Sequence, residues 1–162
     1  MSPKEIIEQD QREKMLSREA SYRHTLETEK RHEKLFAPYG ISFSVYRVLT
    51  YLLLSGGSAA PSQIADDLVI LRTNMTNLLN NLEKRNLVER ALDPSDRRRL
   101  IVRILPEGEK LAQKAMAEEK RYGQRIMAYI SEEDVQEYHR LEKRMYEAKV
   151  AALNDILSER EV

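Results

Sequence analysis

Two short stretches carry side chains that could do chemistry, and both favour binding over catalysis. Residues 73–82 contain no charged side chain, although 33% of the whole chain is charged. Asparagine can bond bidentately to adenine N6 and N7, threonine offers a hydroxyl and a methyl group for thymine, and both reach phosphates. The alternative is an ordinary solvent-facing surface. The outward positions predicted for this stretch are Asn74, Thr76, Asn77, Asn80 and Asn81.

The second stretch is "DPSDRRRLIVRIL", residues 93–105, in which three consecutive arginines precede a β-branched run. Residues 72–103 hold eight basic and four acidic side chains, so this segment has a net charge of +4 in a chain whose net charge is zero. A local patch is enough to attract phosphates, and arginines at a hairpin tip can enter a narrow minor groove. One arginine could instead pair with Asp93 or Asp96 to stiffen the turn. The run could also be a charged edge that prevents strand pairing.

Composition excludes several other classes of site. The chain has no cysteine, which removes disulfides, thiolate nucleophiles and thiol redox sensing. Its three histidines, His24, His32 and His139, show no zinc-ligand spacing, so we expect no metal and no cofactor. We find no phosphate-binding glycine loop and no nucleophile elbow, and therefore predict no enzyme activity. No apolar run approaches the ~20 residues of a membrane span, and the charged N-terminus is no secretory signal. We therefore predict a cytoplasmic protein without membrane contact.

The elements that position these stretches follow from breakers and apolar periodicity. Most of the chain is predicted to be helical, with one hairpin in the middle third. The predicted elements are a long charged helix over 4–37, a helix from the Ser42 cap to Gly56 and Gly57, a short helix in 61–70, a helix in 71–86, strands in 87–92 and 99–105, and long helices over 107–130 and from Ser131 onward.

Local signals place the ends of these elements. Thr73 is a candidate N-cap, and Asn86 can take the left-handed conformation that closes a helix. Asp93 and Pro94 predict a tight turn. The residues of the last helix that repeat at steps of three and four predict a seam for another helix, within the chain or across a dimer. These seam residues are Val135, Tyr138, Leu141, Met145, Ala148, Ala152 and Ile156.

Two helices joined by a short turn, with a β-hairpin directly after the second, form a winged helix-turn-helix. We therefore predict a mainly α fold with a small β-hairpin wing. The DNA-binding region is expected at 41–108, and 1–40 together with 109–162 are expected to form a helical dimerisation region.

The chain resembles the MarR family of bacterial transcription regulators, most strongly over residues 42–108. The segments that carry the resemblance are "LEKRNLVER", the wing "DPSDRR" and the "PEG" that follows the second strand. It implies a homodimer with helix 73–85 in the major groove, Arg97 or Arg98 in the minor groove, and half-sites about one helical turn apart. Asn86 and Leu105 depart from the family, which usually has glycine and threonine there.

The resemblance also implies a small, often aromatic, effector bound between the dimerisation helices and the DNA-binding part. Positions that could line such a cleft are His32, Phe36, Phe43 and Arg47. Each has an ordinary alternative, because the two phenylalanines could be core residues and the other two could be surface or ion-pair residues.

The prediction is thus a dimeric, sequence-specific repressor that a small ligand releases from a pseudo-palindromic operator. The alternatives are a DNA-binding regulator without an effector and a winged-helix module for protein–protein contact. The predicted DNA contacts are Arg72, Thr73, Asn74, Thr76, Asn77, Asn80, Arg97, Arg98 and Arg99.

Overall fold

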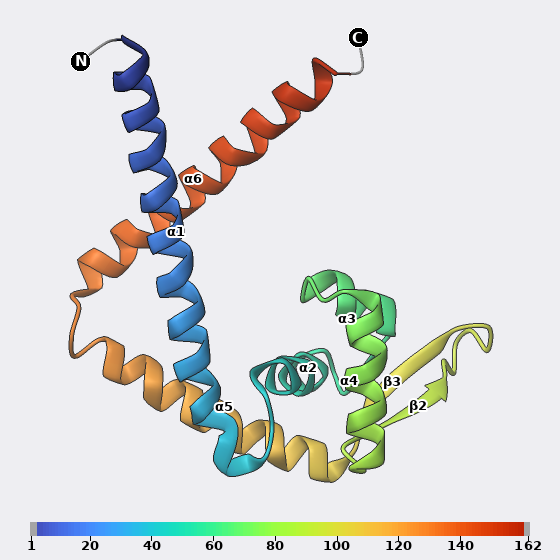
Figure 1. Ribbon diagram of the computed structural model, residues 1–162. Coiled ribbons are helices and arrows are strands. Elements are labelled where there is room, and N and C mark those ends of the chain that lie inside the picture. The colour runs from blue at the N-terminus through green and yellow to red at the C-terminus, as the bar shows by residue number, and fades with distance from the viewer. Residues whose placement is uncertain (1–2, 161–162) are drawn as a thin grey trace. The chain divides into compact units, whose positions relative to one another are not determined.

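The structure is a computed structural model that describes residues 3–160 and, within them, the side chains of 9 and 11–160. The chain forms two compact units, which meet in sequence between Glu118 and Glu119. The elements, labelled in Figure 1, are α1 (Pro3–Phe36), η1 (Ala37–Tyr39), α2 (Phe43–Leu54), β1 (Ser58–Ala59), α3 (Pro61–Asp67), α4 (Arg72–Lys84), β2 (Val88–Leu92), β3 (Leu100–Ile104), α5 (Pro106–Ile126) and α6 (Glu132–Ser158).

The predicted fold class is confirmed: the chain is mainly helical, with a small antiparallel sheet. The helix boundaries follow local chemistry. The Ser42 hydroxyl accepts a hydrogen bond from the Val45 backbone N–H at 3.2 Å, which caps α2. Asn86 closes α4 with a φ of 55°, and the Ser131 hydroxyl accepts from the Asp134 N–H at 3.1 Å to cap α6.

The sheet contains one strand more than the predicted hairpin. The strand order is β1-β3-β2, and all pairs are antiparallel. β1 has only two residues, Ser58 and Ala59, which pair with Arg103 and Val102 of β3. A strand this short shows no alternation of apolar and polar residues, so only the turn residues around it could be recognised from the sequence. Its effect is to tie the chain after α2 to the base of the hairpin.

The predicted N-cap of α4 is wrong. α4 begins at Arg72, Leu71 occupies the cap position without a side-chain cap, and Thr73 is the second helical residue. The reason lies in the preceding turn, where Val69 has a φ of 52° and the Ile70 N–H bonds to the Ala65 carbonyl at 2.8 Å. This turn closes α3 and leaves Leu71 extended, so the cap of α4 lies two residues before the predicted Thr73.

The predicted end of α5 is also wrong. The helix stops at Ile126 instead of 130, and the next residues form turns in which the Tyr129 N–H bonds to the Ile126 carbonyl at 2.8 Å. Tyr129, which lies within the predicted helix 107–130, is 89% exposed. Because Ser131 must be extended to cap α6, α5 ends before it.

One apolar core holds the first unit together. The core consists of buried residues of α2, α3, α4 and the hairpin, together with Phe36 at the end of α1. α5 reaches this core through Gly108, Ala112 and Ala115, whose small side chains allow a close approach. The core side chains that are completely or almost completely buried are Phe36, Val48, Leu49, Leu52, Ile64, Leu79, Leu82, Val88 and Val102.

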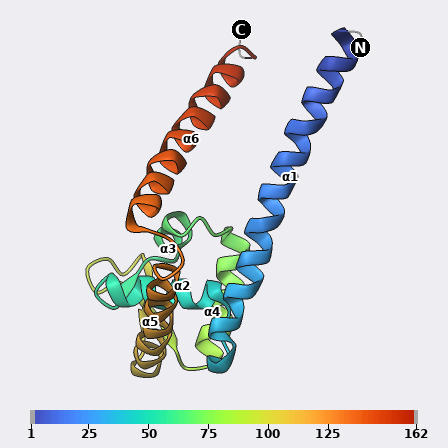
Figure 2. The same cartoon turned by 90° about the vertical axis from the view of Figure 1, so that its left-hand side faces the viewer.

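The long helices α1 and α6 are largely exposed, each within its own unit. Within the first unit, α1 extends away from α2 (Figure 2), and residues 11–31 are all exposed. In the second unit, no residue of α6 is buried, and Tyr138, Leu141 and Met145 of the predicted seam are each about half exposed. None of the helices in the described part of the chain combines the length and the apolar character needed to cross a membrane.

Candidate nucleic-acid interface

α4 separates a buried apolar face from an exposed polar one. Met75, Leu79 and Leu82 are buried in the core at helical spacing. The six amide and hydroxyl residues of the opposite side are all exposed, which agrees with the outward positions expected from sequence. These residues are Thr73, Asn74, Thr76, Asn77, Asn80 and Asn81.

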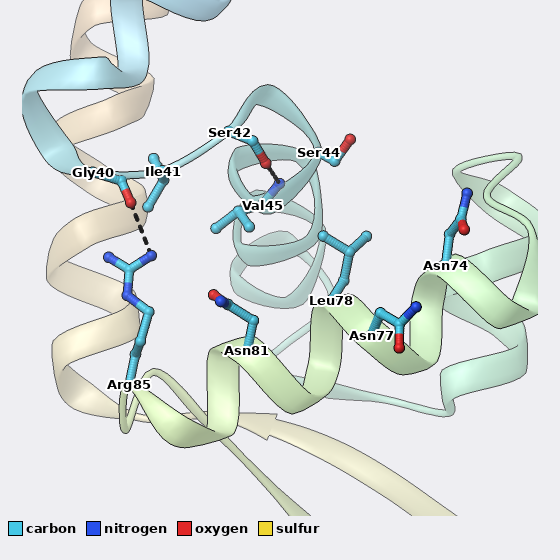
Figure 3. A pocket seen from close by; sticks show the side chains of 10 residues that line it. All are labelled: Gly40, Ile41, Ser42, Ser44, Val45, Asn74, Asn77, Leu78, Asn81 and Arg85. Atoms are coloured by element: carbon cyan, nitrogen blue, oxygen red, sulfur yellow. Dashed lines mark hydrogen bonds between the residues drawn. The ribbon is translucent and has the colours of Figure 1, made fainter.

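A hollow of about 540 Å³ lies on one flank of α4, and we call it the α2–α4 hollow (Figure 3). Asn74, Asn77, Asn81 and Arg85 follow one another along α4 and line one of its sides. The Arg85 Nη1 donates to the Gly40 carbonyl at 3.0 Å, which joins the end of α4 to the turn before α2. The remaining lining residues are Ile41, Ser42, Ser44, Val45 and Leu78.

A second depression of about 380 Å³, the wing groove, lies on the other flank of α4. Residues from α3, α4 and both strands of the hairpin line it, so the polar face of α4 and the hairpin border the same depression. Its lining residues are Pro61, Ser62, Ala65, Arg72, Met75, Thr76, Leu79, Asn80, Arg90 and Leu100.

The turn between β2 and β3, at the tip of the wing, is held by its own carboxylates. Asp93 Oδ1 accepts from the Ser95 N–H at 2.8 Å and from the Ser95 hydroxyl at 2.6 Å. Asp96 Oδ1 accepts from the Arg98 N–H at 3.0 Å. The Ser95 hydroxyl, followed by the Ser95 N–H, lowers the pKa of Asp93 below its ordinary value. Both carboxylates therefore stiffen the turn through backbone groups.

The three wing arginines are left available by this arrangement. Arg97, Arg98 and Arg99 are exposed, and within the described residues none of them forms a salt bridge. We considered from sequence that one arginine pairs with Asp93 or Asp96. The carboxylates instead bind backbone N–H groups, although the charge of Arg99 contributes to the lowered pKa of Asp93.

Other basic side chains of this region are neutralised within the protein. Arg90 of β2 pairs with Glu83 of α4, and Arg103 pairs with Glu89 across the hairpin at 2.8 Å. Arg72 at the start of α4 lies 3.8 Å from Asp66, so the positive charge that remains is carried by the wing tip and by Lys84 and Arg85 at the end of α4. The positive potential is therefore concentrated where the polar face of α4 is also exposed.

The residues expected to bind an effector are in mutual contact. Phe36 is fully buried and stacks on Tyr46, with ring centroids 4.6 Å apart. The His32 ring lies 4.8 Å from that of Phe43, centroid to centroid. Arg47 lies 5.9 Å from the Phe43 ring centre and donates to the Leu68 carbonyl at 2.6 Å. Its guanidinium thus ties α2 to the end of α3, as the Tyr51 hydroxyl does by donating to Asp67 at 2.5 Å, a bond that raises the Tyr51 pKa.

Comparison with known proteins places this geometry in a family. The MarR family model matches residues 39–99, from the end of η1 through the wing tip. The HTH-type transcriptional regulator PrsX of Escherichia coli is 31% identical over 121 residues, which cover 74% of this chain and 70% of PrsX. The chain belongs to the MarR family. It is a winged helix-turn-helix transcriptional regulator that binds DNA, not an enzyme.

Other relatives of this MarR-family chain agree. The regulator FarR of Neisseria gonorrhoeae is 31% identical over 108 residues, covering 67% of this chain and 64% of FarR. The structure of Staphylococcus aureus MepR in complex with DNA has a TM-score of 0.68 and 24% identity, covering 83% of this chain and 95% of MepR. The structure of the organohalide-sensing regulator RdhR has a TM-score of 0.70 and 15% identity, and the match covers 86% of this chain and 81% of RdhR. The last two show the shared fold.

The structure adds residues to the candidate interface that were not singled out from the sequence. Ser44 lines the α2–α4 hollow and Ser62 lines the wing groove. Arg85 also lines the α2–α4 hollow, whereas in the sequence it was only one of the eight basic residues counted in 72–103. No sequence signal marks the two serines, because their position depends on how α2 and α3 pack against α4. In the described residues, no group of three or more histidine, aspartate and glutamate side chains is arranged to hold a metal ion.

Proposed function

We propose that this chain forms a homodimer that represses transcription by binding a pseudo-palindromic operator. α4 of each protomer enters a major groove through its amide and hydroxyl face, and Arg97 or Arg98 enters the flanking minor groove. The observation that carries the proposal is the uncharged, exposed face of α4 beside an arginine-tipped hairpin, both bordering the wing groove. The adjacent major and minor grooves of B-DNA present the matching pair of surfaces.

The proposed domains follow the same logic. Residues 41–108 bind DNA, whereas 1–40 and 109–162 supply the dimer contact. Large apolar side chains in contiguous exposed stretches mark interaction sites. α1 exposes Met15, Tyr22 and Leu26, and α6 exposes a seam that includes Leu141 and Met145. A two-fold dimer that covers these faces sets two α4 helices about one helical turn apart.

Selection of bound DNA from a random pool tests the DNA-binding part. We expect an enriched pseudo-palindrome, and a logarithm of the binding constant that falls linearly with the logarithm of the salt concentration. Arg97→Ala and Arg98→Ala are expected to weaken binding, and the one that loses a phosphate contact lowers the slope by about 0.9 per contact. Binding that ignores salt and both substitutions would instead indicate a protein-binding winged helix.

For release from DNA, we propose a small aromatic ligand that favours a spacing of the α4 helices mismatched to successive major grooves. The ring contacts of His32, Phe36 and Phe43 favour the second candidate, a regulator without an effector, because a ligand there has to displace packed side chains. Titration with salicylate as a phenolic probe, with and without operator, separates the two. Ligand binding that leaves operator affinity unchanged contradicts ligand-driven release.

A further inference from the structure

Asn80 differs from the other asparagines of α4 in having a side-chain partner. Its Oδ1 accepts a hydrogen bond from the Arg90 Nη2 at 2.9 Å. Among the described residues, Asn74, Asn77 and Asn81 make no side-chain hydrogen bond. The carboxamides of those three residues can therefore turn to suit a base, whereas that of Asn80 is engaged before DNA arrives.

Arg90 is itself fixed from the opposite side. Its Nη1 donates to Glu83 Oε2, and its backbone N–H donates to Glu83 Oε1 at 3.1 Å. The Arg90 side chain is only 25% exposed and the Glu83 side chain 31%. One carboxylate of α4 thus holds both the main chain and the guanidinium of a β2 residue, and we call Glu83, Arg90 and Asn80 the carboxamide clamp.

The chemistry of the clamp determines which end of the Asn80 carboxamide is exposed. A guanidinium carries hydrogen-bond donors and no acceptor, so the carbonyl oxygen of Asn80 has to face it. The NH₂ group then points away from Arg90, and the residue is exposed on the rim of the wing groove. Bidentate reading of adenine requires the carboxamide oxygen as well as its NH₂. The bond from Arg90 occupies one of the two lone pairs of that oxygen and turns the oxygen toward the hairpin, which disfavours the base contact that the sequence suggests for an asparagine here.

We propose that Arg90 is a positioning residue that makes Asn80 an obligate hydrogen-bond donor toward DNA. Its target is an acceptor: a phosphate oxygen, or the N7 or O6 edge of a purine. Cytosine, which presents an N4 amino donor in the major groove, is not accepted. This inference rests on the proposed function, in which the polar face of α4 meets DNA, and it adds a division of labour between one fixed and three adaptable asparagines.

Operator affinity measured with a set of variants and a panel of base substitutions tests the proposal. Asn80→Ala is expected to weaken operator binding by about five- to tenfold per protomer, the value of one hydrogen bond. If the acceptor is a base, the loss is confined to one operator position and discrimination against cytosine disappears there. If it is a phosphate, the loss is uniform across sequences.

Arg90 variants then test the positioning role. Arg90→Lys retains a donor without an acceptor and is expected to keep the wild-type affinities across the base-substitution panel. Arg90→Met is expected to reproduce the affinity losses of Asn80→Ala. The double variant Asn80→Ala, Arg90→Met should lose no more affinity than either single variant. The salt slope stays unchanged in Arg90→Met, because Glu83 already neutralises Arg90. Arg103→Met breaks the other Arg–Glu pair of the hairpin and serves as the matched control, with affinity and base preference unchanged.

An NMR measurement on the wild-type protein tests the proposal even if the Arg90 variants do not fold. The side-chain NH₂ resonances of Asn80 in the wild-type protein, assigned with Asn80→Ala, are expected to shift when operator is added. Three results overturn the inference: NH₂ resonances that do not respond to operator, an Asn80→Ala variant with full affinity on every sequence, or additive effects of Asn80→Ala and Arg90→Met. If no operator is enriched at all, the proposed function fails instead, so the two failures are distinguishable.

Discussion

Replacing Gly108 with alanine should break a close approach between α5 and the base of the hairpin. A β-carbon at this position lies 2.1 Å from the Leu87 carbonyl oxygen and 2.9 Å from Cγ1 of Ile104. The Leu87 oxygen belongs to the backbone and already accepts the Leu105 N–H at 2.9 Å. It cannot swing aside as the end of a flexible side chain would, so α5 has to move away from the base of the hairpin.

The expected cost follows from what this movement disrupts. Relieving a 2.1 Å contact requires about 1 Å of separation, which repacks the buried residues around Gly108 at about 1–3 kcal/mol. The same movement stretches the Leu105–Leu87 hydrogen bond, which contributes about 1 kcal/mol. We therefore expect Gly108→Ala to lower the free energy of unfolding by about 2–4 kcal/mol.

Equilibrium urea unfolding at a fixed protein concentration measures this loss, and the same helix provides the control. Gly123 also lies in α5, but a β-carbon there meets nothing within 4 Å. Gly123→Ala is expected to raise stability by about 0.5–1 kcal/mol, because alanine is favoured in a helix interior. Equal effects of the two substitutions, or an unchanged midpoint for Gly108→Ala, would refute the reasoning that a close backbone contact selects glycine at 108.

Further predictions concern the turns that frame α4. Val69→Gly is expected to raise the thermal unfolding temperature, with a gain of about 0.5–1 kcal/mol, because Val69 is 90% exposed and has a φ of 52°, which disfavours a β-branched residue; an unchanged or lower temperature contradicts this strain. Ser42→Ala is expected to cost about 1 kcal/mol in urea unfolding by removing the α2 cap, whereas Ser42→Thr should restore most of it. Because the pKa of Asp93 is lowered in the fold, the wing turn keeps its bonds above the ordinary carboxyl range and loses them only as the pH falls through the lowered value. The Ser95 amide resonance should therefore titrate with a midpoint below about 3.9, and a midpoint above that value rules the Asp93 bond out.

The elements were predictable from sequence because their signals are local. Apolar residues at helical spacing marked the buried stripe of α4, and Asp93 with Pro94 marked the turn of the hairpin. The misplaced boundaries of α4 and α5 have non-local or conformational causes. No side-chain preference announces that Val69 takes a left-handed conformation, which moves the start of α4, and β1 exists only because β3 lies beside it.

The candidate interface was predicted in composition but not in effective charge. A count of charges along the sequence gives Arg90 and Arg103 the same weight as the wing arginines. In the fold, however, Arg90 is paired with Glu83 and Arg103 with Glu89. Arg72 at the start of α4 is also paired, with Asp66 at 3.8 Å, so the cations that remain lie at the wing tip and at the end of α4. Residues 73–82 carry no acidic side chain. Since counterion release depends on charges that are free to meet phosphates, Arg90 should contribute specificity through its bond to Asn80, and the unpaired arginines should contribute affinity through charge. The same residue type thus has two roles in one hairpin, and only the positions of the carboxylates decide which arginine has which role.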